Sequence, residues 1–364
     1  MAARILIMAG GTGGHVFPAI AVARELRAEG ADILWLGTRA GLEAEVVPRA
    51  GFELATVAIG GLRGKGLLRW LSLPFRLAWA MVQSLQIILR FRPMAVLGMG
   101  GFAAGPGGLM TWLLRKPLLV HEQNAVAGLT NRWLAVLADR CMVAFPGALP
   151  ARLHPQLIGN PVRAEIAALP EPADRMRGRT GPLRLLVLGG SQGAQALNET
   201  LPRVIAALPL AERPQIRHQS GRAQAAAVER SYAGLDVKAE VQVFIDDMAA
   251  AYAWADLVVC RAGALTIAEL TAAGIGALLV PFPQAVDDHQ TRNAAYLVDA
   301  GAGLLLVQDS RLEARLIELL GGFCRAAVNG GRDDVLRMAR AARRLAQPES
   351  ARQVARLCLE AAHG

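Results

Sequence analysis

Closely spaced cysteines are missing from this chain. Its 364 residues include four cysteines with no C-x-x-C pair among them: Cys141, Cys260, Cys324 and Cys358. Zinc sites and the disulfide frameworks of small secreted domains depend on cysteines in close or regular spacing. Neither kind of site is predicted, and the pattern fits a protein of the reducing cytoplasm.

Long apolar runs are missing as well. A membrane-spanning helix needs about 20 mostly apolar residues, whereas the apolar window at residues 67–90 is interrupted by Arg69, Arg76 and Arg90. The few apolar residues before Gly10 form too short a run for the core of a secretory signal. We therefore expect neither a membrane span nor a secretory leader.

Three signatures of common nucleotide-binding proteins are also absent. The chain has no G-x-x-x-x-G-K-[ST] loop, which Walker-type NTPases require. No tyrosine is followed four residues later by lysine, as it would be in short-chain dehydrogenases and epimerases. Arg39 stands near the end of the second predicted strand, where a nicotinamide-binding fold has an acid for the ribose. These absences argue against all three classes.

One long stretch contains no acidic residue. No Asp or Glu occurs between Glu53 and Glu122. The net charge of the chain is +9, and residues 1–162 hold 16 basic and 8 acidic residues, against 23 and 22 in the remainder. The acid-free stretch contains eight basic residues: Arg63, Lys65, Arg69, Arg76, Arg90, Arg92, Arg115 and Lys116.

Bulky apolar residues are interleaved with these cations. A helix starting at Pro74 would place Phe75, Trp79 and Val82 on one side. Such a helix is suited to an anionic membrane surface, which the basic residues within 63–92 and 115–116 would contact. The alternative is an ordinary amphipathic helix packed on a sheet. The missing acids favour the membrane surface, and since the chain has no recognisable nucleic-acid motif, nucleic acid is not predicted as a partner.

A glycine turn organises each half of the chain. The apolar run Arg4–Ala9 leads into Gly10-Gly11-Thr12-Gly13-Gly14-His15, and a helical pattern begins near Pro18. The run Leu185–Leu188 leads in the same way into Gly189-Gly190-Ser191-Gln192-Gly193-Ala194. Glycines let the backbone approach a ligand closely, and the N–H groups at a helix start attract anions. The pattern predicts a phosphate at these turns.

Strands and helices alternate in both halves, which predicts an α/β fold of two parallel-sheet domains. We place the domains at residues 1–162 and 163–345, and expect the last helical segment, within 346–364, to pack back on the first domain. If the two sheets face each other, the turns at the carboxyl ends of their strands line one cleft. The expected strands are Arg4–Ala9, Ile33–Gly37, Pro93–Leu97, Pro117–His121, Leu185–Leu188, Gln215–Gln219, Val241–Phe244, Leu257–Cys260 and Ala277–Val280.

Two polar segments of the second half suit a nucleotide sugar. Arg261–Glu269 has the pattern of a loop entering a helix, which makes an anion site, and Glu269 one turn inside can accept both hydroxyls of a ribose. Asp287–Asn293 supplies amide and carboxylate groups for the hydroxyls of a sugar. A diphosphate donor with a separate acceptor fits these segments better than a dinucleotide does.

Taken in order, the motifs resemble those of glycosyltransferase family 28, and in particular its peptidoglycan N-acetylglucosaminyltransferases. The resemblance covers nearly the whole chain. It rests on Gly10–Pro18, Gly98–Phe102, Gly105–Gly108, His121–Asn124, Gly159–Arg163, Gly189–Ala194, Phe244–Met248 and Arg261–Glu269.

The resemblance implies a GT-B fold, with lipid I, the undecaprenyl-linked muramyl pentapeptide, held by the N-terminal domain. UDP-N-acetylglucosamine would bind mainly to the C-terminal domain, and the protein would sit peripherally on the cytoplasmic face of the inner membrane. Phe102 stands where a Tyr is expected, so any hydroxyl contact at that point is in question. The donor-binding positions carried over by motif are Thr12, Gly13, Gly14, Asn124, Arg163, Ser191, Ile245, Ala264, Leu265, Thr266, Ile267, Ala268, Glu269 and Gln290.

The implied reaction is an inverting transfer of N-acetylglucosamine to the 4-hydroxyl of the muramyl group. It needs a base for the hydroxyl proton and a stabiliser for the departing diphosphate. His15 is the first candidate for the base, with hydrogen bonding to a substrate as its rival role, and Glu122 and His121 are the next candidates. Backbone N–H groups at Ser191–Ala194, with Arg163, would stabilise the diphosphate.

No metal or other cofactor is predicted, because the chain has no D-x-D triplet. Two alternatives stay open. One is a GT-B glycosyltransferase with another lipid acceptor, such as a diacylglycerol, and the other is a membrane-docked scaffold that binds a UDP-sugar without turnover.

Overall fold

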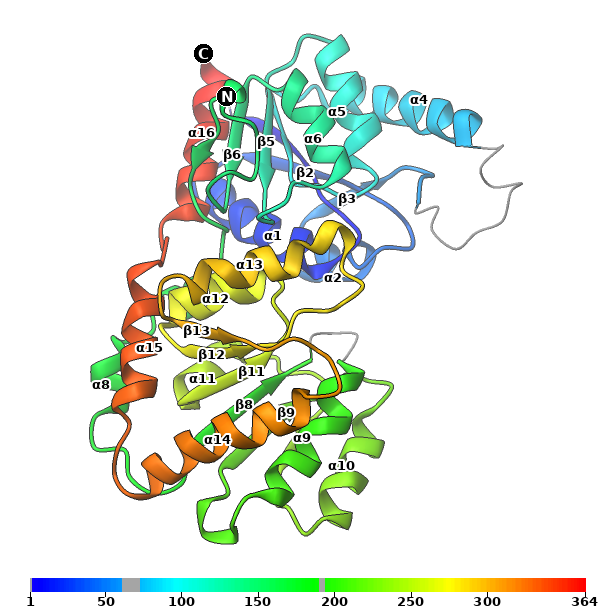
Figure 1. Ribbon diagram of the computed structural model, residues 1–364. Helices are drawn as coiled ribbons and strands as arrows, with labels where there is room; N and C mark the ends of the chain where they lie inside the picture. Colours follow the sequence, from blue (N-terminus) through cyan, green and yellow to red (C-terminus); the bar gives the residue numbers. More distant parts are fainter. Residues whose placement is uncertain (1, 61–72, 190–193) are drawn as a thin grey trace. The chain divides into compact units, whose positions relative to one another are not determined.

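The structure of the protein, a computed structural model, describes residues 2–60, 73–189 and 194–364 (Figure 1). The chain divides into two compact units. The residues up to Arg163 form unit 1 together with Gln347–Gly364, and Ala164–Ala346 form unit 2. None of the helices in the described residues combines the length and the apolar character needed to cross a bilayer.

Unit 1 is built on a parallel sheet with the strand order β3-β2-β1-β4-β5-β6-β7 among the described residues. The order reverses direction between β1 and β4, as in doubly wound nucleotide-binding folds. Its strands are β1 (Arg4–Met8), β2 (Asp32–Gly37), β3 (Glu53–Thr56), β4 (Ala95–Gly98), β5 (Leu118–Glu122), β6 (Arg140–Val143) and β7 (Gln156–Leu157).

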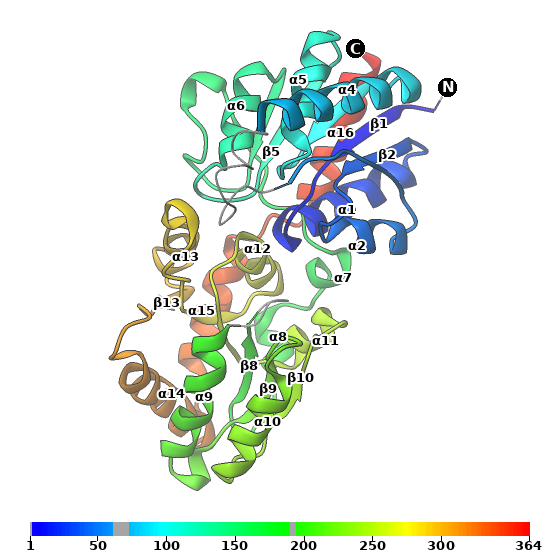
Figure 2. The same ribbon diagram turned by 90° about the vertical axis from the view of Figure 1, so that its right-hand side faces the viewer.

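Helices cover both faces of this sheet, because successive strand residues point to opposite sides. Ile5 and Ile7 of β1 belong to a buried cluster with apolar residues of α1, α2 and α16, whereas Leu6 and Met8 join a second cluster with residues of α4, α5 and α6. Figure 2 shows α1 and α2 on one side of β1 and α4 and α5 on the other. The helices are α1 (Gly13–Ala28), α2 (Glu43–Arg49), α4 (Leu73–Phe91), α5 (Ala104–Leu113), α6 (Leu129–Leu137), the 3-10 helix η1 (Ala151–Leu153) and α16 (Ser350–His363).

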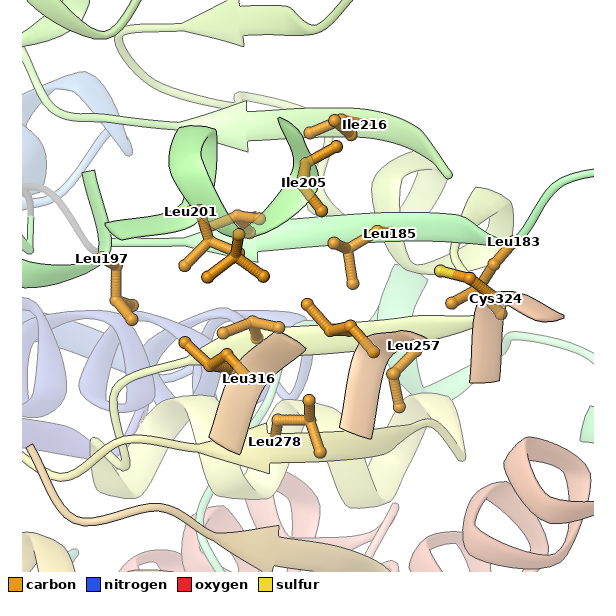
Figure 3. Packing of buried hydrophobic residues seen from close by; sticks show 14 of the residues in the cluster. Leu183, Leu185, Leu197, Leu201, Ile205, Ile216, Leu257, Leu278, Leu316 and Cys324 are labelled. Carbon is orange, nitrogen blue, oxygen red and sulfur yellow. The ribbon is translucent and has the colours of Figure 1, made fainter. Parts of the chain in front are cut away.

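Unit 2 repeats the same plan. Its parallel sheet has the order β10-β9-β8-β11-β12-β13 among the described residues, with the reversal between β8 and β11. Leu185, Leu257 and Leu278 lie in one buried cluster with side chains of α9 and α14 (Figure 3). The strands are β8 (Arg184–Leu188), β9 (Gln215–Gln219), β10 (Glu240–Gln242), β11 (Leu257–Cys260), β12 (Gly276–Leu279) and β13 (Gly303–Leu305).

The helices of unit 2 lie mostly between successive strands, as a parallel sheet requires. They are α7 (Ala164–Ala167), α8 (Pro172–Met176), α9 (Gln195–Ala207), η2 (Leu210–Glu212), α10 (Ala225–Gly234), α11 (Met248–Trp254), α12 (Ala264–Ala273), η3 (Val286–Asp288), α13 (His289–Val298), α14 (Leu312–Val328) and α15 (Asp333–Arg344). The prediction of two parallel-sheet α/β domains is confirmed.

Two local predictions are wrong. The helix expected from Pro18 begins at Gly13, so Gly13, Gly14 and His15 form its first turn. Glycine is disfavoured inside helices, so the sequence pattern does not mark Gly13 and Gly14 as helical. The strand expected at Val241–Phe244 ends at Gln242, and Phe244 is largely exposed.

Candidate functional site

In unit 1 the strand order reverses between β1 and β4, and the turns after these two strands are bonded to each other. Met99 N donates to Met8 O at 2.8 Å, and Gly10 N donates to Gly100 O at 3.3 Å. A Cβ added to Gly101 would lie 2.4 Å from Gly10 O, so only glycine permits this approach. Ligands of open α/β sheets bind at such a reversal, outside the carboxyl ends of the strands.

The first turn of α1 opens onto this edge of the sheet. Thr12 is the residue before the helix and its side chain makes no capping hydrogen bond, so the first N–H groups of the helix have no side-chain cap. Thr12 is exposed, and Gly13, Gly14 and His15 are partly exposed. The partial positive charge of a helix start favours an anion or a polar ligand here.

A buried carboxylate is hydrogen-bonded to the backbone of the glycine turn. Glu43 is fully buried, and its Oε2 accepts a hydrogen bond from Gly11 N at 2.9 Å. Its Oε1 accepts from Thr38 N at 2.9 Å and from Thr38 Oγ1 at 2.7 Å. Gly11 N is therefore already occupied. The phosphate expected at this turn would depend on the amides from Thr12 onward.

His15 is held by a chain of polar groups that comes from β5 and the loop after it. His15 Nδ1 lies 2.7 Å from Gln123 Oε1. Gln123 Nε2 lies 3.1 Å from His121 Nδ1, and His121 Nε2 lies 2.9 Å from the carbonyl oxygen of Gly159. Gln123 and His121 are fully buried, whereas His15 is partly exposed. Of these hydrogen-bonded side chains, His15 is therefore the one that can reach a substrate.

The carboxylate of Glu122 binds the loop that follows β5. Its Oε1 accepts from Asn124 N at 2.8 Å and from Asn124 Nδ2 at 3.3 Å, and its Oε2 accepts from Gly128 N at 3.1 Å and Asn131 Nδ2 at 2.9 Å. Only 1% of Glu122 is exposed. This geometry favours a loop anchor over a base for Glu122. Asn124 is the partly exposed residue that this anchor positions.

In unit 2 the predicted ribose carboxylate, Glu269, lies near the middle of α12 (Ala264–Ala273). Gly263 precedes this helix in extended conformation, and Ile267 N donates to Gly263 O at 2.9 Å. Glu269 is 6% exposed, and Tyr252 donates its hydroxyl to Glu269 Oε2 at 3.1 Å. The helix therefore brings its N-terminus and a carboxylate into one small region, beside the carboxyl end of β11.

The predicted sugar-binding segment lies beside the same strand ends. Gln290 Oε1 accepts from Phe282 N at 2.9 Å. Arg261 Nη1 donates to Val280 O at 3.0 Å and to Pro281 O at 3.2 Å, and burial lowers the pKa of Arg261. The loops after β11 and β12 are thus tied to each other.

The remaining predicted positions differ in their surroundings. Ala264, Ile267 and Ile245 are buried, whereas Leu265, Thr266, Ala268 and Arg163 are partly exposed. Phe102, at the position where Tyr is expected, is 51% exposed. Ser191 lies outside the described residues, so its place in the site stays a prediction. Among the described residues no group of three or more His, Cys, Asp or Glu side chains is arranged to hold a metal ion.

Three residues of these sites were given no role by the sequence interpretation: Glu43, Gln123 and Tyr252. Gln123 follows His121 by two residues, and alternation along an extended segment places such residues on one side. That spacing was a usable signal for Gln123. Glu43 and Tyr252 acquire their roles through contacts with residues 32 and 17 positions away, which no local pattern encodes.

Two buried histidines should make the protein sensitive to acid. Burial lowers the pKa of His121 in unit 1 and of His218 in unit 2 from 6.5 to about 4. Below pH 6.5 the unfolded chain binds protons that the folded chain excludes, so the stability due to each neutral histidine is complete above that pH and is lost as pH falls toward 4. The free energy of unfolding should fall by up to about 1.4 kcal/mol per pH unit for each histidine.

Urea denaturation followed from pH 7 to pH 4 measures this slope. In His218→Gln the dependence of the unfolding free energy on pH should become shallower, because the unfolded chain then binds one proton fewer. An unchanged slope in that variant would contradict the assignment. The exposed His363 provides the control, since His363→Gln should leave the slope as it is.

Two doubly wound units, each with a helix start at the reversal of its sheet, are the architecture of the GT-B fold. The model of the glycosyltransferase family 28 N-terminal domain matches residues 5–143, and that of the family 28 C-terminal domain matches residues 184–324. The chain therefore belongs to glycosyltransferase family 28, as its motifs predict.

Similar proteins match this chain over nearly its full length. A UDP-N-acetylglucosamine--N-acetylmuramyl-(pentapeptide) pyrophosphoryl-undecaprenol N-acetylglucosamine transferase of Nitrosococcus oceani is 56% identical over 100% of both chains. The protein of the same name from Alkalilimnicola ehrlichii is 54% identical over 98% of this chain and 99% of its own. The crystal structure of MurG from Acinetobacter baumannii is 38% identical, with a TM-score of 0.82 over 98% of this chain and 99% of that one.

Proposed function

We propose that the protein transfers N-acetylglucosamine from UDP-N-acetylglucosamine to the 4-hydroxyl of lipid I in peptidoglycan synthesis, with inversion at the anomeric carbon. Its membership of family 28 and the names of its full-length relatives support this reaction. The structural observation that carries it is the place of His15. This partly exposed imidazole lies in the first turn of α1, beside the reversal of the sheet in unit 1.

The proposed mechanism follows from what each group can do. The oxygen of the acceptor hydroxyl attacks the anomeric carbon, the bond from that carbon to the UDP oxygen breaks, and the hydroxyl proton passes to Nε2 of His15. The start of α12 and the backbone at residues 191–194 would stabilise the charge that develops on the diphosphate. Glu269 would accept the ribose hydroxyls, and Gln290 would contact the sugar.

The test is release of UDP from UDP-N-acetylglucosamine, with a short-chain lipid I analogue as the acceptor. We expect release that depends on this acceptor and is undiminished in EDTA. Release with a diacylglycerol acceptor instead would favour the alternative transferase. Binding of UDP-N-acetylglucosamine without any acceptor-dependent release would favour the scaffold and overturn the proposal.

We further propose that unit 1 docks on the cytoplasmic face of the inner membrane through α4 and the end of α5. Phe75 and Trp79 of α4 are 79% and 55% exposed. Trp112 and Leu113 at the end of the neighbouring α5 are also exposed, and Arg115 and Lys116 follow them. Apolar rings among cations suit the interface of an anionic bilayer.

A hollow of about 430 Å³ lies next to these residues of α4. Its lining combines apolar side chains with two guanidinium groups, which matches a ligand with an acyl or isoprenoid part and an anionic head. The lining residues are Thr38, Arg39, Ala40, Val57, Ala58, Ile59, Phe75, Arg76 and Trp79.

Flotation with vesicles that contain phosphatidylglycerol tests the docking surface. The triple variant Phe75→Ser, Arg76→Ser, Trp79→Ser should lose most vesicle binding, because it removes two inserted rings and one cation. The control replaces Leu210, Val307 and Arg344, which are exposed on unit 2, by serine and should float as the native protein does. Equal vesicle binding by both triple variants would contradict the docking proposal.

A further inference from the structure

The orientation of the Gln123 side-chain amide follows from two backbone carbonyl groups. Gln123 contacts the first directly, and the second acts through the ring of His121. Gln123 Nε2 lies 2.9 Å from the carbonyl oxygen of His121, and a carbonyl oxygen can only accept. The atom facing it must therefore be the amide nitrogen. The amide oxygen of Gln123 then faces His15 Nδ1 at 2.7 Å.

The ring of His121 supports the same orientation independently. His121 Nε2 faces the carbonyl oxygen of Gly159 at 2.9 Å and must carry a proton to bond with it. Burial lowers the pKa of His121 to about 4, so the ring is neutral at pH 7 and its Nδ1 is an acceptor. That acceptor faces Gln123 Nε2 at 3.1 Å, so the two N–H groups of the amide bond to the carbonyl oxygen and to Nδ1 of His121.

We infer that Gln123 and His121 are positioning residues that set the tautomer of His15, with the proton on Nδ1 and the lone pair on Nε2. The amide oxygen of Gln123 has no proton to give, so His15 Nδ1 must donate. In a neutral imidazole only one nitrogen carries a proton, so Nε2 is left as the acceptor. That is the form a general base needs before it takes a proton.

Gly100 holds the ring from another side. Its φ is +93°, and a Cβ added there would lie 2.9 Å from both Cε1 and Nδ1 of His15. The ring is therefore packed against bare backbone while its Nδ1 is bonded to a buried amide. An imidazole without these contacts is free to adopt the Nε2–H form, which is the commoner one in water and cannot accept a proton at Nε2.

The inference rests on the proposed role of His15 as the base, but its first test needs no substrate. Long-range ¹H–¹⁵N correlation spectra of the full chain, labelled with ¹⁵N-histidine, report which ring nitrogen carries the proton. The signals of His15 are assigned by their loss in His15→Gln. We expect a protonated Nδ1 and an unprotonated Nε2, and the Nε2–H form in the native protein would overturn the inference.

Two variants of Gln123 test whether its acceptor oxygen sets the tautomer of His15. Gln123→Leu removes the acceptor, so the Nε2–H form of His15 should appear and kcat should fall by about 10- to 10⁴-fold, between the losses seen for partners of metal-bound histidines and for the orienting carboxylate of a catalytic triad. KM for the donor should stay unchanged. Gln123→Glu keeps an acceptor oxygen for His15, and its buried carboxyl, when protonated at the other oxygen, still donates to the carbonyl oxygen of His121, so this variant should keep the Nδ1–H form. A tautomer unaffected by Gln123→Leu would contradict the inference.

The matched control is Asn131→Leu. Asn131 is buried beside the same loop and donates to the carbonyl oxygen of His121 at 3.1 Å, but it makes no contact with His15. It should loosen the loop without changing the tautomer. If the spectra are as expected but His15→Gln remains fully active, the proposed base is wrong while the tautomer assignment holds, so the two failures are distinguishable.

Discussion

Replacing His15 by alanine should lower kcat for UDP release by about 10²- to 10⁴-fold, the contribution typical of a positioned general base. The physical reason is that no other described imidazole near this edge of the sheet is both exposed and bonded at Nδ1. His121 is fully buried and its Nε2 is committed to Gly159. Steady-state kinetics with saturating UDP-N-acetylglucosamine and lipid I analogue provide the measurement.

The split between kcat and KM decides between the two roles of His15. A loss confined to kcat is expected for proton transfer, whereas a rise in KM with unchanged kcat would assign His15 to substrate binding. The control is His363→Ala, an exposed histidine at the end of α16 in the same unit. It should retain native kinetics.

Replacing Asp256 by alanine should cost unit 2 about 3–5 kcal/mol of its free energy of unfolding. The Asp256 side chain is fully buried and pairs with Arg179 and Arg332, whose side chains are 9% and 8% exposed. It also accepts from Arg184 N at 3.1 Å, at the start of β8. Alanine would leave two buried guanidinium groups without their counter-ion.

Urea denaturation with a probe in unit 2 measures this loss. The control is Asp174→Ala, which breaks an ion pair with Arg177 whose side chains are 57% and 79% exposed. An exposed pair of this kind contributes about 0–1 kcal/mol, so the control should unfold almost as the native chain does. Equal losses in both variants would show that burial does not set the strength of the Asp256 pairs.

Strands were predicted best where a continuous apolar run of at least four residues is buried on both faces of a sheet. β1 and β8 are almost wholly buried and appear in the sequence as continuous apolar runs. β3, β6, β7 and β13 were not predicted. β6 has only three apolar residues, after Arg140, and β3, β7 and β13 are short strands at the edges of the described sheets. β3 is only partly buried and both residues of β7 are exposed, so neither has an apolar run to mark it.

The candidate site divides in the same way. Motif order singled out His15, Glu269 and Gln290, because glycine turns and helix starts are local patterns, and the roles of these three residues stay predictions. The spacing from His121 could have singled out Gln123, but its contact with His15 could not be predicted, since the two residues lie 108 positions apart along the chain. Whether a carboxylate serves as a base or as a loop anchor also depends on distant donors, as the four hydrogen bonds of Glu122 illustrate.

The packing of α16 in unit 1 has a consequence for biosynthesis. Val354, Ala355, Leu357 and Cys358 complete the buried cluster that Ile5 and Ile7 begin, so this core joins segments from both sides of unit 2 in the sequence. Unit 2 is one continuous segment, Ala164–Ala346, and all of its residues leave the ribosome before α16 does, so it can fold while unit 1 is still incomplete. A chain that ends before α16 would expose the apolar face of α1, which makes α16 the segment that completes the folding of unit 1.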